Sequence, residues 1–319
     1  MNLQSALLNT QRLVFLYGTT PPRADVPPKR LHRAASRLAE RVADLNLDGI
    51  IVYDVQDESS RTVEPRPFPY LPTTDSRLYA RLLEETTNKP TITYKCVGQV
   101  VEPDWARWLD ETDGEYGLCC LALVGRASSR SADGAGSGAP HSHGITLTQA
   151  LERASAHPAA YLLGGVVIPE RHTAIRSESH RLIGKADAGC QFFTSQAVYD
   201  PAATIRLCRD YADDCQALGV SPKRLILTFT PCGRPETLRF LQWLGVGVPE
   251  SVQQAILSSP TPIDASIGAC AESLRAVLES GVGSRVPLGI NVESVSIRRE
   301  EIDASIALFS KLQEIVAEM

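Results

Sequence analysis

Carboxylates and amides stand at the ends of the apolar, strand-like segments of this sequence. Asp54, Asp57 and Glu58 lie at the end of, or just after, the apolar segment 49–55. Clustered carboxylates raise one another's pKa, which suits them to general acid or base catalysis. We therefore take these three as candidate catalytic residues. For Asp57 and Glu58 the alternative of a solvent-facing pair beside Arg61 is equally open.

Amides and other polar side chains occupy the same positions elsewhere. Gln196 ends the apolar segment 190–196, and a buried amide there needs hydrogen-bond partners. A site lined by acids and amides suits a polar heterocycle with amide and amine edges. The remaining polar or glycine positions at segment ends are Tyr17, Gly18, Tyr53, Gln56, Lys95, Gln99, Arg126, Glu170, His172, Tyr199, Thr230, Glu236, Asn291 and Glu293.

Two basic residues have open alternatives. His172 follows the apolar segment 161–168, where it either orients a ligand or caps the next helix. Lys185 lies late in the expected helix 174–188. It either contacts a phosphate or interacts with the helix dipole.

Strand and helix patterns alternate along the whole chain. Strands are expected at 12–18, 49–55, 91–96, 116–125, 161–168, 190–196, 224–230 and 286–292. Helices are expected at 31–45, 75–87, 104–111, 174–188, 234–244, 263–280 and 302–316, with further helices beginning at Thr146 and Asp200. This order predicts the α/β class and one (β/α)8 TIM barrel domain over residues 1–319, with function at the carboxyl ends of its strands. The turn after the first strand lacks the glycines of a dinucleotide-binding fold.

Composition indicates which binding partners and which cellular compartment to expect for this protein. The 319 residues are 43% hydrophobic and carry a net charge of −5, which gives no electrostatic case for nucleic acid or an anionic membrane. The N-terminal residues do not have the pattern of a secretory signal, so we expect a cytoplasmic protein. The eight cysteines have no zinc spacing and indicate reduced core thiols rather than a metal site. Residues 126–144, rich in Gly and Ser, predict a flexible surface loop in which His141 and His143 are solvated.

Several motifs together resemble the methylenetetrahydrofolate reductase family. Asp187-Ala188-Gly189-Cys190 followed by Thr194-Ser195-Gln196 and Asp200 is similar to that family's sixth strand. Further matches are Ile168-Pro169-Glu170-Arg171-His172, Pro21-Pro22-Arg23 and Val246-Gly247-Val248-Pro249. The resemblance spans essentially the whole chain. It implies a barrel that reduces methylenetetrahydrofolate to methyltetrahydrofolate with NAD(P)H and carries FAD.

The resemblance also implies roles for single residues. Gln196 matches a folate-binding glutamine, and Glu236 falls near a second amide that binds substrate. His172 and Lys185 match positions that touch the flavin, and Glu178 stands where the family has a flavin-contacting Asp. Tyr17 and Tyr199, at strand ends, complete the predicted substrate-binding set. The family's dimers and tetramers imply a homo-oligomer.

The chain departs from the family at important positions. The acid thought to protonate the folate is replaced by Gly18, and the R-G-D motif after the fourth strand is Val124-Gly125-Arg126. An Arg in place of an Asp reverses the charge beside the flavin, which puts FAD binding in doubt.

Three hypotheses follow. The first is a reductase that transfers hydride directly from NAD(P)H to the bound folate, with a relocated acid such as Asp54, Asp57 or Glu58. The second is a folate-dependent methyl or hydroxymethyl transfer enzyme. The third is a non-catalytic barrel that binds folate or a partner.

Overall fold

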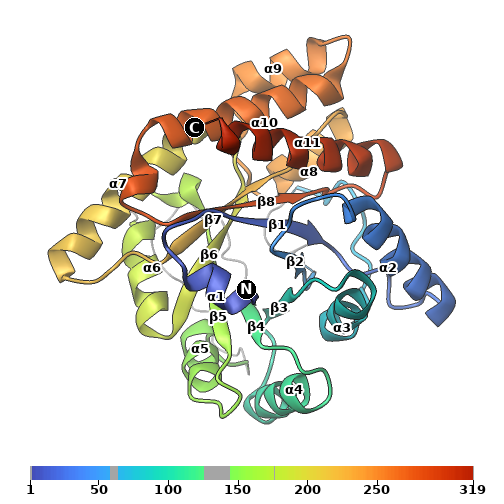
Figure 1. The fold of residues 1–319 in the computed structure, drawn as a ribbon, viewed down its shortest axis with the longest axis vertical. Coiled ribbons are helices and arrows are strands. Elements are labelled where there is room, and N and C mark those ends of the chain that lie inside the picture. The colour runs from blue at the N-terminus through green and yellow to red at the C-terminus, as the bar shows by residue number, and fades with distance from the viewer. Residues whose placement is uncertain (1, 58–63, 126–143, 176, 319) are drawn as a thin grey trace.

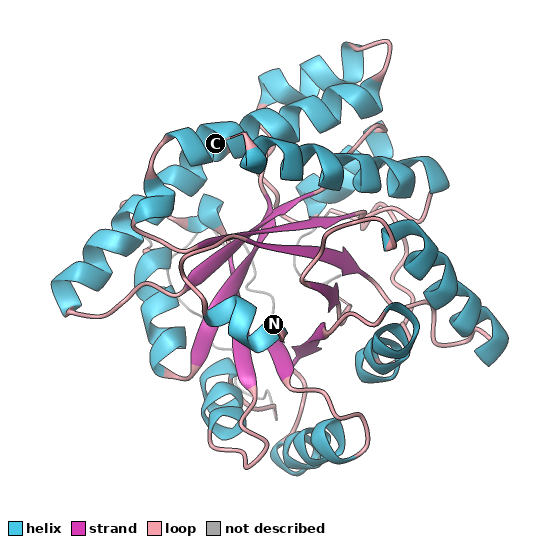
Figure 2. Cartoon of the chain, in the orientation of Figure 1, coloured by secondary structure: helices cyan, strands magenta, loops and turns pink. Residues whose placement is uncertain are grey.

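Eight parallel strands close into a barrel in the order β1 to β8, and helices surround them (Figures 1 and 2). The structure is a computed structural model that describes residues 2–57, 64–125, 144–175 and 177–318. The predicted (β/α)8 TIM barrel is confirmed. Glu58 and residues 126–143 of the predicted flexible loop lie outside the described residues.

The strands are short and follow the predicted apolar segments closely. They are β1 (Val14–Thr19), β2 (Gly49–Val52), β3 (Thr91–Cys96), β4 (Cys120–Val124), β5 (Leu162–Val167), β6 (Cys190–Ala197), β7 (Arg224–Phe229) and β8 (Leu288–Glu293). The helices are α1 (Leu3–Leu8), α2 (Pro28–Val42), α3 (Ser76–Thr87), α4 (Glu102–Gly114), α5 (Leu147–Ser155), α6 (Glu178–Asp187), α7 (Pro201–Leu218), α8 (Pro235–Trp243), α9 (Glu250–Ser258), α10 (Pro262–Glu279) and α11 (Arg299–Ala317). Two 3₁₀ turns add η1 (Pro169–Arg171) and η2 (Val282–Ser284).

Local capping explains where several helices begin. Thr146 and Gln149 form the predicted reciprocal capping box at the start of α5. The Asp200 side chain accepts a hydrogen bond from the Ala203 amide, and Pro201 occupies the first turn of α7. Both predicted helix starts are confirmed, which fixes the direction in which the chain leaves the mouth of the barrel.

Side chains of each strand alternate between two buried layers. One layer fills the barrel interior and includes Leu16, Ile92 and Phe192. The other lies between the strands and the surrounding helices and includes Tyr17 and Phe193. Because neighbouring residues of a strand face opposite sides, this alternation decides which predicted site residues can reach the mouth.

The amino ends of the strands are covered by α1, which crosses the centre of the barrel in Figure 1. Leu3, Ala6 and Leu7 of this helix pack onto the interior layer. The buried Arg224 guanidinium donates to the carbonyls of Leu7 and Asn9. We call this helix and its arginine contact the floor of the barrel.

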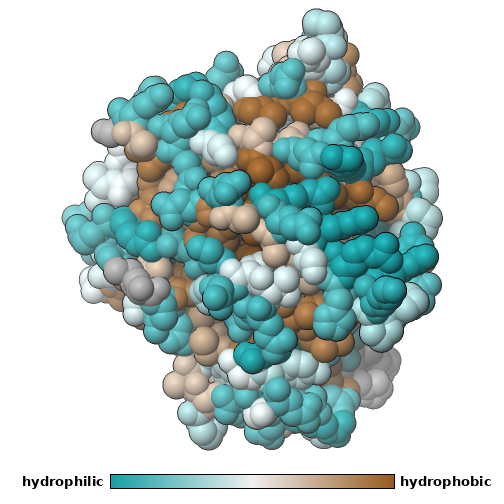
Figure 3. All heavy atoms as spheres, turned by 45° about the vertical axis from the view of Figure 1, so that its right-hand side comes forward, coloured by the Kyte–Doolittle hydropathy of each residue, from teal (hydrophilic) through white to brown (hydrophobic). Residues whose placement is uncertain are grey.

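The outer helices are amphipathic. In α2 the buried residues are Leu31, Ala35, Leu38 and Val42, spaced along one face. Polar side chains cover most of the face that Figure 3 presents, with apolar side chains between them. Within the described part of the chain, no helix combines the length and apolarity required to cross a membrane.

Candidate functional site

The mouth, formed by the carboxyl ends of the strands, carries an arc of polar side chains over several neighbouring strands. Strand register sets their level: Thr228 pairs with Asn291, and Gly18 pairs with Glu293. Ala197, next to Gln196, pairs with Thr228. The arc therefore runs through β6, β7, β8 and β1, with Thr228 and Asn291 at one level and Gly18 and Glu293 two residues further along the strands.

Tyr53, at the end of β2, joins this arc. The Asn291 amide donates to the Tyr53 hydroxyl at 2.9 Å and to the Thr228 hydroxyl at 3.2 Å. The Tyr53 ring packs edge-on against Tyr94, with ring centroids 4.8 Å apart. These contacts hold Asn291 and Tyr53 in fixed positions beside Glu293.

The packing of Tyr53 and Glu293 leaves no space for a side chain at position 18, which is a glycine. A Cβ atom at position 18 would lie 2.9 Å from the Tyr53 hydroxyl oxygen and 3.1 Å from the Glu293 Cβ. The Tyr53 side chain thus fills the space that a side chain at position 18 would need. The nearest carboxylate along the arc belongs to Glu293, on the strand that pairs with β1.

Glu293 has the electrostatic character of a proton donor. Burial raises its pKa from 4.5 to about 6, although its interactions with Tyr53 and Asn291 act in the opposite direction. Burial also raises the pKa of Tyr53 well above its ordinary value, and the Glu293 charge adds to that effect. A carboxyl group with a pKa near 6 holds its proton over part of the pH range in which enzymes work.

Gln196 extends the arc on the opposite side. Its Nε2 donates to the Leu244 carbonyl at 3.1 Å. Among the described residues, its Oε1 and the Oδ1 of Asn291 are buried without a hydrogen-bond partner. Leaving such an acceptor unsatisfied costs about 1–3 kcal/mol, so two amide oxygens at the mouth are ready to accept hydrogen bonds from a ligand.

The segment after α8 is held over this side of the mouth. The Glu170 carboxylate accepts a hydrogen bond from the Gly247 amide at 3.4 Å. Burial raises the pKa of Glu170. Together with the Gln196 contact to Leu244, this fixes residues 244–247 beside β5 and β6.

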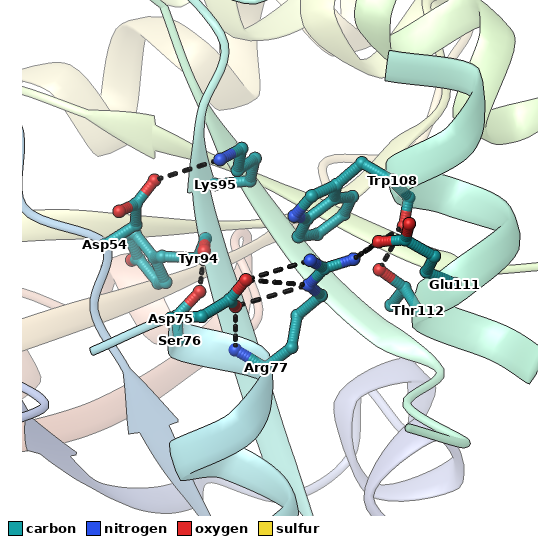
Figure 4. Close-up of polar contacts among 9 residues, drawn as sticks. All are labelled: Asp54, Asp75, Ser76, Arg77, Tyr94, Lys95, Trp108, Glu111 and Thr112. Carbon is teal, nitrogen blue, oxygen red and sulfur yellow. Dashed lines mark hydrogen bonds and ion pairs between the residues drawn. The ribbon is translucent and has the colours of Figure 1, made fainter. Parts of the chain in front are cut away.

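The three predicted catalytic carboxylates are placed differently from Glu293. Asp54 accepts a hydrogen bond from the Cys96 amide at 2.8 Å. It also lies 3.9 Å from the Lys95 Nζ, an ion pair that Figure 4 shows. Asp57 is exposed, and Glu58 lies outside the described residues. Asp54 and Gln196 do lie at the same end of the barrel, but Asp54 is engaged between β2 and β3. The catalytic role of these acids stays a prediction.

A buried arginine supports this part of the mouth from outside. Arg77 of α3 forms ion pairs with Asp75 at 2.8 Å and with Glu111 of α4 at 3.0 Å (Figure 4). The neighbouring Ser76 hydroxyl donates to the Tyr94 carbonyl at 2.9 Å. These bonds tie α3 and α4 to the end of β3.

The residues predicted to touch a flavin are occupied by internal contacts. His172 accepts from the Glu178 amide at 3.2 Å and bonds Asp210 at 2.7 Å, so it caps α6. Glu178 is only 2% exposed, and Lys185 donates to the Val166 carbonyl. Burial lowers the pKa of Lys185. These three side chains do not fit FAD in the manner of the resembled family.

Three predicted substrate-binding residues are not brought to the mouth interior. Tyr17 shares a hydrogen bond with Ser305 of α11, and Tyr199 donates to the Thr230 carbonyl; both rings lie between strands and helices. Glu236 is half exposed and pairs with Arg239 on the outside of α8. The strand-end pattern did not distinguish residues that face the interior from residues that face the helices.

Sequence reasoning left Tyr53, Asn291 and Glu293 out of the predicted set, although each stands at a strand end. What brings these residues together is the pairing register of the strands, which a single sequence does not reveal. The described residues contain no group of three or more His, Cys, Asp or Glu side chains suited to a metal ion.

One solved structure is similar over almost the entire chain. It is an uncharacterized protein from Clostridium thermocellum that binds two copies of 5-methyl-5,6,7,8-tetrahydrofolic acid. The two chains share 28% identity with a TM-score of 0.81, and the match covers 98% of this chain and 99% of that one. No protein-family model matches the chain, and no curated protein sequence matches it.

Two other solved barrels are more distant. A dihydropteroate synthase from Xanthomonas albilineans has a TM-score of 0.46 at 13% identity, over 97% of this chain and 94% of that one. The carboxyl transferase domain of Rhizobium etli pyruvate carboxylase has a TM-score of 0.48 at 12% identity, over 98% and 49%. At these values neither structure informs the site.

Proposed function

We propose that this protein binds a reduced folate at the mouth of its barrel and reduces 5,10-methylenetetrahydrofolate with NAD(P)H. The observation that carries the proposal is the full-length similarity to a barrel that binds 5-methyltetrahydrofolate, because this compound is the product of that reduction. The motifs shared with the methylenetetrahydrofolate reductase family support the same chemistry.

The polar arc suits the pterin ring. The amino group and ring N–H groups of a reduced pterin are donors, and the unpartnered Gln196 Oε1 and Asn291 Oδ1 are acceptors. Donors and acceptors that match along one edge discriminate strongly between ligands, because a wrong ligand leaves buried groups unpaired.

Glu293 supplies the proton in this proposal. Reduction opens the methylene bridge: the bond between the bridge carbon and N10 breaks, N10 takes a proton, and the bridge carbon receives a hydride from the nicotinamide. The products are 5-methyltetrahydrofolate and NAD(P)+. With a pKa of about 6, Glu293 is the partly buried carboxyl of the arc best able to deliver that proton, and in this proposal it replaces the acid missing at Gly18.

No step passes through a flavin. A flavin, when bound, supplies a hydride relay between nicotinamide and folate. Here, however, His172 bonds Asp210 of α7, Glu178 accepts from the Ile168 amide, and Lys185 donates to a carbonyl of β5. Direct transfer requires that the nicotinamide ring and the folate ring be held face to face. Such positioning alone can lower the activation free energy by a large amount.

The test combines binding and turnover. Calorimetry is expected to detect 5-methyltetrahydrofolate binding to the wild-type protein and to Glu293→Gln. Oxidation of NADH or NADPH with 5,10-methylenetetrahydrofolate is expected for the wild type and lost in Glu293→Gln. Absence of folate binding would remove the proposal entirely.

A methyl transfer enzyme is the second candidate, because the 5-methyl compound bound by the similar barrel is itself a methyl donor. Binding of 5-methyltetrahydrofolate without oxidation of either nicotinamide at high protein concentration would favour transfer. If no acceptor is methylated either, the third hypothesis of a non-catalytic folate-binding barrel gains support.

A further inference from the structure

An arginine at the mouth lies among aromatic rings, and no carboxylate of the described residues forms an ion pair with it. Arg66, in the segment after β2, has its guanidinium carbon over the rings of Tyr70, Phe240 and Trp243, at 5.6, 5.5 and 5.3 Å from their centroids. We call these three residues the aromatic cluster. Its rings come from the segment after β2 and from α8, which follows β7, so Arg66 joins these two parts of the barrel.

The position of Arg66 relative to the polar arc follows from two bonds. On one side, the Tyr70 hydroxyl donates to the Val55 carbonyl at 3.2 Å, close to Asp54. On the other, Trp243 directly precedes Leu244, whose carbonyl accepts from Gln196. The Trp243 indole N–H also donates to the Glu64 carbonyl at 3.1 Å. Arg66 therefore lies at the same end of the barrel as Gln196 and is connected to it through Trp243 and Leu244.

The guanidinium has unused donors. Its Nε and Nη1 are buried and have no hydrogen-bond partner among the described residues. Aromatic rings interact with the faces of a guanidinium, whereas its N–H groups point outward in its plane. The edge thus stays available for an acceptor. A carboxylate is the acceptor whose geometry matches two parallel N–H groups.

We propose that Arg66 binds the carboxylate of the glutamate tail of a folate, with the aminobenzoyl ring of the ligand against the aromatic cluster. This inference rests on the proposed folate function and adds a second contact region to it. The pterin meets the polar arc inside the mouth, and the tail leaves past Gln196 and Trp243 to Arg66.

The experiment compares ligands with and without the tail. Calorimetry measures 5-methyltetrahydrofolate, 6-methyltetrahydropterin and p-aminobenzoylglutamate on wild type and Arg66→Gln. Loss of one charge-assisted pair is expected to weaken folate binding about tenfold or more. The variant should bind the tail-free pterin as the wild type does and should lose the aminobenzoylglutamate fragment.

Controls separate the alternatives. Arg239→Gln, an exposed arginine of α8, should leave all three affinities unchanged, and Arg66→Lys should restore part of the folate affinity. The inference is wrong if Arg66→Gln affects both folate and pterin equally, affects neither, or weakens only NADPH binding, which would assign Arg66 to a phosphate. If the wild type binds no folate, the proposed function fails together with this inference. If Arg66→Gln does not fold, the same three affinities of Arg66→Lys and wild type are compared, and equal folate affinity in these two proteins would contradict the inference.

Discussion

Replacement of Glu293 by glutamine should change how stability depends on pH. The pKa of the partly buried Glu293 carboxyl is about 6 in the folded protein against an ordinary value of 4.5. Because the folded state holds the proton more tightly, the contribution of Glu293 to stability is full below pH 4.5 and is lost as pH rises through 6. At 1.36 kcal/mol per pKa unit, the loss amounts to about 2 kcal/mol.

The assay is urea unfolding of wild type and Glu293→Gln at a series of pH values from 4.5 to about 7.5. Glutamine stays neutral throughout, so the unfolding free energy of the variant minus that of the wild type should grow by about 2 kcal/mol over this range. Glu236→Gln, a half-exposed carboxylate on α8, serves as control and should show a nearly constant difference. A constant difference for Glu293→Gln as well would refute the claim that burial governs this carboxyl.

Three further predictions test the site and the fold. Gln196→Ala should weaken 5-methyltetrahydrofolate binding by about 1–3 kcal/mol in calorimetry, since it removes an acceptor from the arc; unchanged affinity would end its role. Gly18→Ala should lower the free energy of unfolding by about 1–3 kcal/mol, because its Cβ would overlap Tyr53. Gly268→Ala, where an added Cβ meets nothing within 4 Å, is the matched control, and equal effects would contradict the packing argument. Arg224→Met should lower the free energy of unfolding by about 3 kcal/mol in urea unfolding, because it leaves buried carbonyls of the floor unpaired. The exposed Arg285→Gln is the control. A smaller loss of stability for Arg224→Met than for this control would contradict the role of Arg224.

The barrel could be predicted because its signals are local. Largely apolar runs such as 49–52 and 225–229 predict strands buried on both faces. Residues such as Thr146 and Asp200 begin helices through contacts three residues away. Helices α1 and α9 were missed. They are short, six and nine residues, and helices of that length depend on tertiary contacts rather than on pattern.

The candidate site was predicted only in part, because its contacts are long-range. Asp54, Asp57 and Glu58 were predicted as a cluster because they are close in the sequence. Asn291 and Tyr53, by contrast, are hydrogen-bonded although 238 residues separate them. Gln196 lies at the mouth, and its buried Oε1 has no hydrogen-bond partner among the described residues; its predicted role in folate binding stays a prediction. For Tyr17 and Tyr199, the residue type gave no indication that their hydroxyls are used by the helix layer.

The floor of the barrel has a practical consequence for experiments on this protein. Because α1 lies across the amino ends of the strands and Arg224 donates to the carbonyls of Leu7 and Asn9, an affinity tag or surface linker placed ahead of Leu3 would project away from the mouth. Immobilised protein would then present its mouth to solution. Trimming the chain to Arg12 to obtain a shorter fragment would instead uncover Leu16 and its apolar neighbours, and such a fragment should aggregate.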